Sequence, residues 1–151
     1  MTLSVVAPVP GRLVPLAEVP DPVFAAAIVG PGAAIDPPRG PVHAVAPLAG
    51  RIVKLHPHAY VVVADDGAGV LVHLGIDTVQ LKGEGFTLHV GEGDRVTAGQ
   101  PVVSFDAAAL ESGGRSPVCP VIALDAAPEM LDGLRSAGEI AVGEPLFVWT
   151  R

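Results

Sequence analysis

Five histidines are the residues of this chain whose side chains suit chemistry near neutral pH: His43, His56, His58, His73 and His89. With an ordinary pKa of about 6.5, an imidazole can act as a nucleophile, a proton donor or a metal ligand. His73 lies in the apolar stretch V-L-V-H-L-G, which predicts a central strand that ends at a glycine. A glycine turn at that point can offer a carbonyl to one ring nitrogen and leave the other nitrogen facing outward.

His58 stands at the start of the segment that precedes His73 in the predicted sheet. The residues of Tyr60–Ala64 and Val70–Leu74 predict two strands, and Asp65–Gly67 predicts a hairpin turn between them. If these strands pair in an antiparallel hairpin, His58 and His73 lie opposite each other on one face. Two facing imidazoles can bind a metal ion, or one can act as a nucleophile while the other helps electrostatically. The spacing is compatible with both.

Short strands joined by tight turns must position these histidines, because the chain is too rich in helix-breaking residues for long helices. Its 151 residues include 18 Gly and 16 Pro, and half of the residues are hydrophobic. That length and apolar content favour one folded domain over residues 1–151 rather than a disordered chain. The strands predicted from alternation and β-branching are Arg51–Leu55, Tyr60–Ala64, Val70–Leu74, Thr87–Val90, Pro101–Phe105 and Leu146–Thr150.

Three short helical segments are also predicted. Asp106 is placed to cap a turn over Ala107–Glu111, which ends at two glycines. Pro20–Ala27 predicts another brief turn, and Pro128 suits the first turn of a helix that continues to Ser136.

Two internal repeats indicate a duplicated fold. Ala7–Leu16 (A-P-V-P-G-R-L-V-P-L) matches Ala46–Leu55 (A-P-L-A-G-R-I-V-K-L), and Arg95–Val102 resembles Glu139–Leu146. Each repeated unit is too short to bury its apolar face alone, so the copies must pack against each other. We therefore expect an all-β fold, a compact β-sandwich or barrel of pseudo-symmetric character with a few short helices.

Charge and cysteine content exclude several functional classes. A net charge of −7, with only 9 basic residues, leaves no basic face for a nucleic-acid partner. Cys119 is the single cysteine, which excludes an internal disulfide and a thiolate-rich metal site. No signal peptide is visible, and no apolar run approaches the roughly 20 residues that span a membrane. We expect a soluble cytoplasmic protein that does not insert into membranes.

One stretch resembles the signature of a known family. V-H-L-G-I-D-T-V-Q-L-K-G-E-G-F (Val72–Phe86) is similar to that of the glucose-type enzyme IIA component of the bacterial phosphoenolpyruvate:sugar phosphotransferase system. The resemblance covers most of the chain and includes A-P-V-P-G, V-P-D-P-V-F-A, I-V-G-P-G, A-P-L-A-G, P-H-A-Y and G-D-R-V-T-A-G-Q-P-V-V-S-F-D. It implies a compact β-sandwich, in which His73 matches the phosphorylated histidine and His58 matches its helper.

The resemblance implies a phosphocarrier. The histidine phosphocarrier protein HPr would supply a phosphoryl group to His73, giving a tele-phosphohistidine, and a cysteine in the IIB domain of a sugar permease would receive it. A permease of the glucose or N-acetylglucosamine type is implied, with a regulatory role that depends on the phosphorylation state. His58 would stabilise the transition state by donating a hydrogen bond. Because the phosphoryl group arrives already activated on nitrogen, no nucleotide or other cofactor is required.

The resemblance also implies a surface that binds HPr and the IIB domain. Apolar contacts ringed by carboxylates would be supplied by Asp21, Val23, Phe24, Val29, Leu71 and Asp77. The apolar members could equally belong to the core, Phe24 above all. Leu71 and Leu74 stand where aromatic residues are common in the family, so the surface is aliphatic here.

His56 and Pro57 depart from the family pattern, which leaves open which group orients His58. A zinc hydrolase is the strongest alternative, because His56, His58, His73 and Asp77 are the ligand types that it would use. No residue suits the general base that such an enzyme needs. Zinc bound by His58, His73 and a partner's carboxylate is compatible with a phosphocarrier.

Two further alternatives are a biotinyl or lipoyl carrier and a purely regulatory binder. The stretch G-D-R-V-T-A-G-Q-P-V suggests the carrier, but neither Lys54 nor Lys82, the two lysines, suits an exposed hairpin tip. A regulatory binder that has lost phosphotransfer would not need both His58 and His73.

Overall fold

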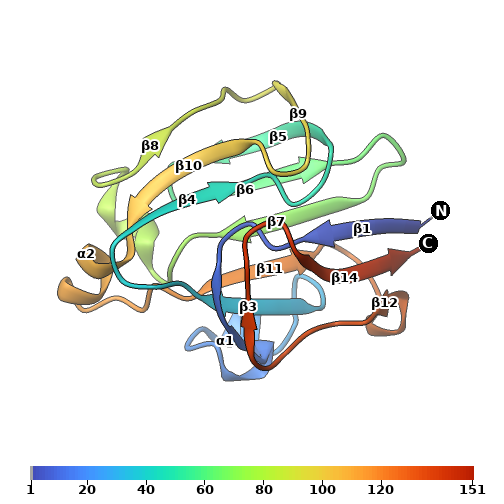
Figure 1. Ribbon diagram of the computed structural model, residues 1–151, viewed down its shortest axis with the longest axis horizontal. Coiled ribbons are helices and arrows are strands. Elements are labelled where there is room, and N and C mark those ends of the chain that lie inside the picture. The colour runs from blue at the N-terminus through green and yellow to red at the C-terminus, as the bar shows by residue number, and fades with distance from the viewer. Residues whose placement is uncertain (1) are drawn as a thin grey trace.

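The computed structural model describes residues 2–151, and strands dominate it (Figure 1). The strands are β1 (Thr2–Val6), β2 (Gly11–Val14), β3 (Gly32–Asp36), β4 (Pro41–Val45), β5 (Gly50–His56), β6 (Ala59–Val63), β7 (Gly69–His73), β8 (Thr87–Leu88), β9 (Arg95–Val96), β10 (Pro101–Asp106), β11 (Cys119–Ala123), β12 (Leu131–Asp132), β13 (Glu139–Ile140) and β14 (Pro145–Thr150). The helical segments are η1 (Leu16–Glu18), α1 (Pro22–Ala25), η2 (Thr78–Leu81), α2 (Ala107–Ser112) and η3 (Pro128–Met130).

The eight-stranded sheet consists of two matching halves. Strands β13-β2-β3-β11 run inward from one edge and β9-β5-β6-β7 from the other, and β11 pairs with β7 at the centre. The two three-stranded sheets, β1-β14-β12 and β4-β10-β8, correspond in the same way. Backbone bonds repeat too: Ala7 N donates to Glu144 O at 2.8 Å, and Ala46 N donates to Gln100 O at 2.9 Å. The pseudo-symmetric all-β fold predicted from the repeats is confirmed.

All six strand predictions are confirmed within two residues, β2, β9 and β13 lie in the predicted repeats, and β1, β3, β4, β11 and β12 were not predicted. β3 (G-A-A-I-D) contains Gly, two Ala and Asp, and β11 (C-P-V-I-A) contains Pro and Ala, all of which are depleted in strands. They form strands because they pair with each other at the centre of the sheet, where nearly all of their residues are buried. Tertiary burial therefore decides these two elements.

The helical predictions have mixed outcomes. Asp106 caps α2 as predicted, its carboxylate accepting from Ala108 N at 2.9 Å, and α1 lies within the predicted turn. The helix predicted from Pro128 to Ser136 is wrong, because η3 ends at Met130. Leu131 then pairs with Trp149 in a strand and packs against the core, and that burial outweighs a short exposed helix.

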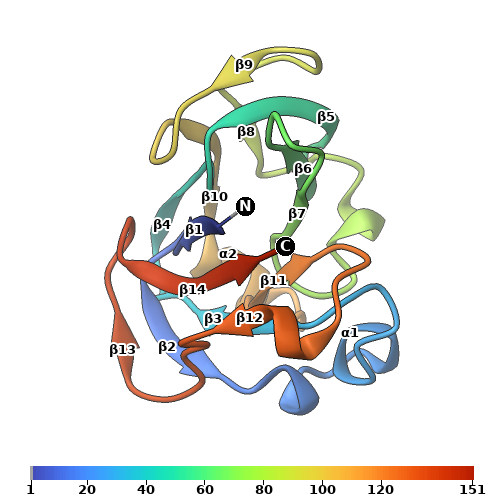
Figure 2. The ribbon, with the colours of Figure 1, turned by 90° about the vertical axis from the view of Figure 1, so that its right-hand side faces the viewer.

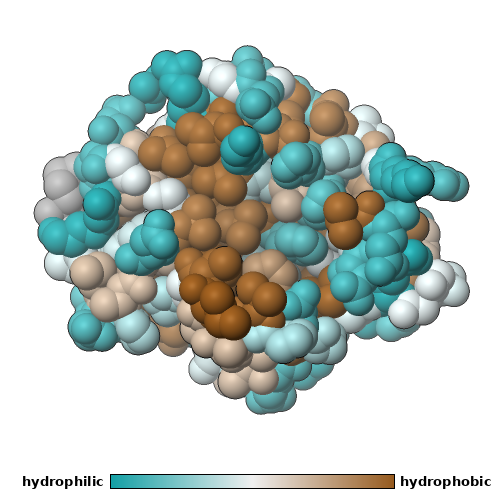
Figure 3. All heavy atoms as spheres, turned by 180° about the vertical axis from the view of Figure 1, so that it is seen from behind, coloured by the Kyte–Doolittle hydropathy of each residue, from teal (hydrophilic) through white to brown (hydrophobic). Residues whose placement is uncertain are grey.

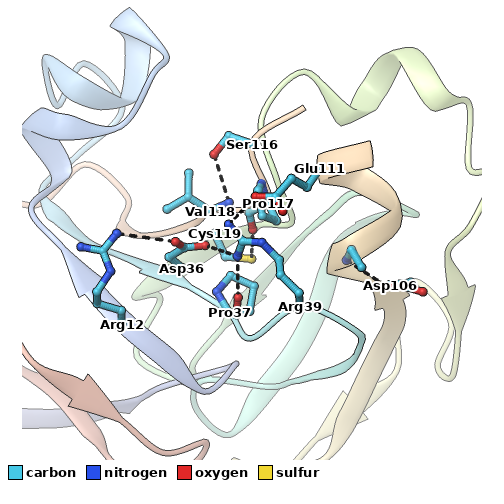
Figure 4. A network of polar contacts seen from close by, with 11 residues as sticks. Arg12, Asp36, Pro37, Arg39, Asp106, Glu111, Ser116, Pro117, Val118 and Cys119 are labelled. Carbon is cyan, nitrogen blue, oxygen red and sulfur yellow. Dashed lines mark hydrogen bonds and ion pairs between the residues drawn. The ribbon is translucent and has the colours of Figure 1, made fainter. Parts of the chain in front are cut away.

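An ionic bracket holds α2 against the sheet (Figure 4). The guanidinium of Arg39 donates to Asp36 Oδ1 at 2.7 Å and to Glu111 Oε2 at 2.8 Å, and Arg12 lies 3.6 Å from Asp36. Exposed ion pairs add little stability, so the bracket mainly fixes position. It keeps Leu110, one of the two buried residues of α2, beneath the turn that follows β7.

Seen from the side, β4 and β10 face β6 and β7 across the core (Figure 2). Tyr60 on β6 is fully buried in that core, and its hydroxyl donates to Val45 O at 2.7 Å. The bond ties the large sheet to the smaller one that contains β4. Tyr60 also lies two residues after His58, on the strand that follows the His58 turn.

Tyr60→Phe should lower the free energy of unfolding by about 1–3 kcal/mol, because it leaves a buried acceptor without this donor. Urea denaturation measures the change. Thr150→Val, which removes an exposed hydroxyl bonded to Asp132 at 3.2 Å, serves as the control and should change stability by no more than about 0.5 kcal/mol. Equal stability of Tyr60→Phe and the wild type would contradict the bridging role.

Candidate functional site

His73 ends β7, and its ring is held by the turn that follows. Nδ1 lies 2.5 Å from Gly75 O. Because a carbonyl can only accept, Nδ1 must carry the proton, and Nε2 therefore carries a lone pair. This is the arrangement predicted from the glycine that follows the strand. The ring presents one unprotonated nitrogen for chemistry.

Glycine is required at position 75. Its φ is +79°, and a Cβ there would lie 2.7 Å from Thr78 Cγ2 and 2.9 Å from Leu110 Cδ1. Two bonds hold the turn in place. Thr78 Oγ1 donates to Leu74 O at 2.8 Å, and Ile76 N donates to Ser116 O at 2.9 Å, in the loop before β11. The acceptor for His73 is therefore fixed in place.

His58 lies in the turn between β5 and β6, one residue before the strand begins. Ala59, not His58, pairs directly with His73, so the predicted direct opposition is wrong by one residue. Leu74 N donates to His58 O at 2.7 Å, which holds the turn beside the end of β7. Because His58 lies outside the strand, its side chain does not follow the strand's alternation. Its ring still meets that of His73, with centroids 5.3 Å apart at 68°.

Two more rings flank this pair. His56 stacks on His58, with centroids 5.6 Å apart at 22°, and Phe24 from α1 lies 5.2 Å from the His73 ring. The sequence left open what orients His58. In the structure the ring of His58 lies between His56 and His73.

Both central histidines are harder to protonate than free imidazole. Burial, together with the nearby His73 and His56, lowers the pKa of His58 to about 4. Burial also lowers the pKa of His73, although its bond to the Gly75 carbonyl and the charges of Asp21 and Asp77 oppose this effect. Both rings are therefore neutral at pH 7, and His73 keeps its nucleophilic lone pair.

The predicted apolar contact residues surround the pair, but they differ in exposure. Phe24 is buried in a small cluster with Val19, Ala34, Ile76, Val118 and Ile122, so it belongs to the core as well as touching His73. Val29 and Leu71 are half-buried against this cluster, and Val23 is 45% exposed. Phe24, Val29 and Leu71 therefore lie in or against one cluster, which contacts His73 through Phe24, whereas Val23, the neighbour of Phe24 in the chain, is freely exposed.

Sequence reasoning missed two apolar side chains with more exposure, Ile28 at 71% and Val79 at 59%. Both belong to sequence motifs quoted above: Ile28 begins I-V-G-P-G, and Val79 ends H-L-G-I-D-T-V. Their exposure depends on the turns after α1 and β7. Figure 2 places α1 and η2 on the side of the molecule that faces backward in Figure 1, and that side carries a continuous apolar area (Figure 3).

The two predicted carboxylates have different local roles. The side chain of Asp21 accepts from Val23 N at 2.9 Å and caps α1. Asp77 is exposed with a φ of +59°, and its side chain makes no capping bond to η2. The negative charges of both acids act to raise the pKa of His73, against the larger effect of burial.

A closed metal centre finds no support among residues 2–151, where no three His, Cys, Asp or Glu side chains are placed to hold a metal ion. The set His56, His58, His73 and Asp77 considered for a zinc hydrolase is thus not arranged as one. Among the same residues, no helix is long and apolar enough to cross a membrane.

Comparison with known proteins identifies the relatives of this chain. It is 45% identical to the glucose-specific EIIA component of the phosphotransferase system of Oceanobacillus iheyensis, over 80% of this chain and 73% of the relative. For the corresponding component of Halalkalibacterium halodurans the identity is 42%, over 94% and 82%. The mannose-specific EIIBCA component of Corynebacterium glutamicum is 44% identical over 83% of this chain, which matches 18% of that longer protein.

The fold comparison agrees. The glucose permease IIA from Mycoplasma capricolum superposes with a TM-score of 0.90 at 31% identity, covering 98% of this chain and 96% of that one. Residues 3–128 match the family described as phosphoenolpyruvate-dependent sugar phosphotransferase system, EIIA 1. The resemblance found in the sequence is confirmed, and this chain belongs to the EIIA 1 family of the sugar phosphotransferase system.

Proposed function

We propose that this chain carries a phosphoryl group on Nε2 of His73, taking it from HPr and passing it to a cysteine in the IIB domain of a sugar permease. The observation that carries the proposal is the bond from Nδ1 to Gly75 O, which leaves Nε2 unprotonated. The relatives named as glucose-specific favour a permease of the glucose or N-acetylglucosamine type. The reaction would take place in the cytoplasm.

The transfer needs only groups that the chain and its partners supply. The Nε2 lone pair of His73 attacks phosphorus, the N–P bond of phospho-HPr breaks, and the donor imidazole keeps the bonding electrons. In the second step a thiolate attacks phosphorus and the bond to Nε2 breaks, which returns the lone pair to His73. Throughout, the proton stays on Nδ1, which donates it in a hydrogen bond to the Gly75 carbonyl. No nucleotide takes part.

His58 assists by donating a hydrogen bond to the phosphoryl oxygens. Charge accumulates on those oxygens in the transition state, and a fixed donor in a partly desolvated site stabilises it. A neutral imidazole has one N–H, and the pKa of about 4 keeps His58 in that form at pH 7. The two ring centroids lie 5.3 Å apart, which supports a role for His58 close to a phosphoryl group on His73.

The partners would dock on the apolar area around the pair. Val23, Ile28, Val29 and Val79 supply surface that gains from being removed from water, and Phe24 supports it from below. Asp21 and Asp77 would meet basic side chains of HPr and the IIB domain. Because a phosphoryl group on His73 changes the charge of this surface, the phosphorylation state could also regulate other partners. Zinc held by His58, His73 and a partner's carboxylate would be a minor mode of the same surface.

His73→Gln should abolish phosphoryl acceptance, because it removes the nucleophile. His58→Gln should still become labelled but should pass the group onward about 100- to 1,000-fold more slowly, the usual cost of one lost donor. Labelled phosphoenolpyruvate with purified upstream components, followed by mapping of the acid-labile adduct, measures both steps. Full labelling of His73→Gln refutes the assignment. Equal and complete loss in both folded variants would mean that the pair acts as one unit, such as a metal site.

His56→Ala should slow onward transfer by about two- to tenfold, because the stacked ring that positions His58 is lost. His56→Phe keeps an aromatic face and should restore most of the rate. If the site instead required a titrating group at position 56, His56→Phe would be as slow as His56→Ala. Single-turnover transfer to a IIB domain measures both variants against His58→Gln. If His56→Ala transfers at the wild-type rate, the stacking does not position His58.

Stability should depend on pH through His58. Its pKa is about 4 when folded, against about 6.5 when unfolded, so its contribution is complete above pH 6.5 and is lost as the pH falls toward 4. Between about pH 7 and pH 4.5, we expect the free energy of unfolding to fall more steeply for the wild type than for His58→Gln. Urea denaturation across this range measures both, and parallel curves would contradict the lowered pKa.

A further inference from the structure

Outside the histidine site, two other histidines converge on one serine hydroxyl. His43 Nδ1 lies 2.7 Å from Ser104 Oγ, and His89 Nε2 lies 2.6 Å from the same oxygen. Both histidines are exposed, and Ser104 is half-buried between them. The proposed phosphotransfer uses none of these three residues. We refer to them as the His43–Ser104–His89 cluster.

The sheet β4-β10-β8 fixes the cluster. His43 on β4 pairs directly with Ser104 on β10, and its neighbour Val42 is buried on the inner face. Strand alternation therefore turns His43 and Ser104 outward. On the other side of β10, His89 N donates to Val102 O at 2.8 Å, which holds His89 against that strand. β4 on one side of β10, and the residue that follows β8 on the other, thus each bring an imidazole to the Ser104 hydroxyl.

The bonding of the cluster directs a lone pair toward its centre. A serine hydroxyl has one proton, so it donates to one imidazole and accepts from the other. The ring nitrogen that accepts from Ser104 already presents a lone pair toward it. In the other ring, moving the proton to the far ring nitrogen leaves a lone pair on the nitrogen that faces Ser104. Each nitrogen lies within hydrogen-bond distance of Oγ, so the two are less than two hydrogen-bond lengths apart. Small side-chain rotations can bring both to the roughly 2.0–2.1 Å that a metal–imidazole bond requires.

We propose that His43 and His89 bind a divalent transition-metal ion, with Ser104 Oγ and water completing the coordination. An imidazole pair suits Cu²⁺, Ni²⁺ and Zn²⁺, and the Irving–Williams order makes Cu²⁺ the tightest binder of the three. The net charge of −7 favours the approach of a cation. With two imidazoles as its only strong ligands, the site is open and its metal exchanges, unlike the closed centres that hold structural zinc.

The test uses Cu²⁺ alone as the probe, on the full chain carrying His58→Gln and His73→Gln so that the other imidazole pair is absent. Calorimetric titration should show one equivalent bound, and electron paramagnetic resonance should show coupling to two imidazole nitrogens. Loss of an outer-shell partner weakens metal binding by roughly 10- to 100-fold. Adding His43→Gln or His89→Gln removes a direct ligand, so each should weaken Cu²⁺ binding by more than that. Each should also remove the two-nitrogen signature.

Two control variants separate the metal ligands from their surroundings. His56→Gln, added to the same background, removes an exposed imidazole elsewhere and should leave Cu²⁺ binding unchanged. Ser104→Ala keeps both imidazoles and should keep the two-nitrogen signature, with an affinity within about tenfold. The proposal is overturned if the two-nitrogen signature persists in both folded variants, His43→Gln and His89→Gln. It is also overturned if the signature is absent from the protein that carries only His58→Gln and His73→Gln. In the otherwise native chain, His43→Gln should accept phosphate normally.

Discussion

The hydrogen bond between His73 Nδ1 and the Gly75 carbonyl is the interaction on which the site depends. It sets the tautomer of the ring, its orientation and the nitrogen left for chemistry. The bond exists because the chain after β7 turns through a positive φ, and because Thr78 and Leu110 leave no space for a side chain at position 75. Two bonds hold the turn that presents this carbonyl: Thr78 Oγ1 donates to Leu74 O, and Ile76 N donates to Ser116 O.

Burial has a chemical purpose at this site. An imidazole removed from water is harder to protonate, and here that desolvation keeps both His58 and His73 neutral at cellular pH. Phe24, which contacts His73, belongs to a cluster against which Val29 and Leu71 also pack. In the proposed function, this group of side chains would help to keep His73 neutral and would shape the surface that a donor protein approaches.

Local signals in the sequence predicted what depends on local structure. The glycine after His73, the hairpin that precedes it and the Asp106 cap each follow from a few neighbouring residues. The one-residue offset of His58 could not be predicted, because it depends on where β6 begins. Strands β3 and β11 are likewise set by pairing partners that are distant in sequence and meet only after folding. Exposure of Ile28 and Val79 depends on the packing of turns, for which a sequence pattern gives no direct signal.

The duplication has a consequence for how this site arose in the fold. The connection between β2 and β3 carries α1, while the corresponding connection between β5 and β6 carries His58, and the halves meet where β11 pairs with β7. Phe24 from one half touches His73 from the other. The site thus lies where the two halves meet, as a shared site does at the interface of a homodimer. The order of strand pairing is common to both halves, whereas the connection that reaches the junction contains a helix in one half and the His58 turn in the other.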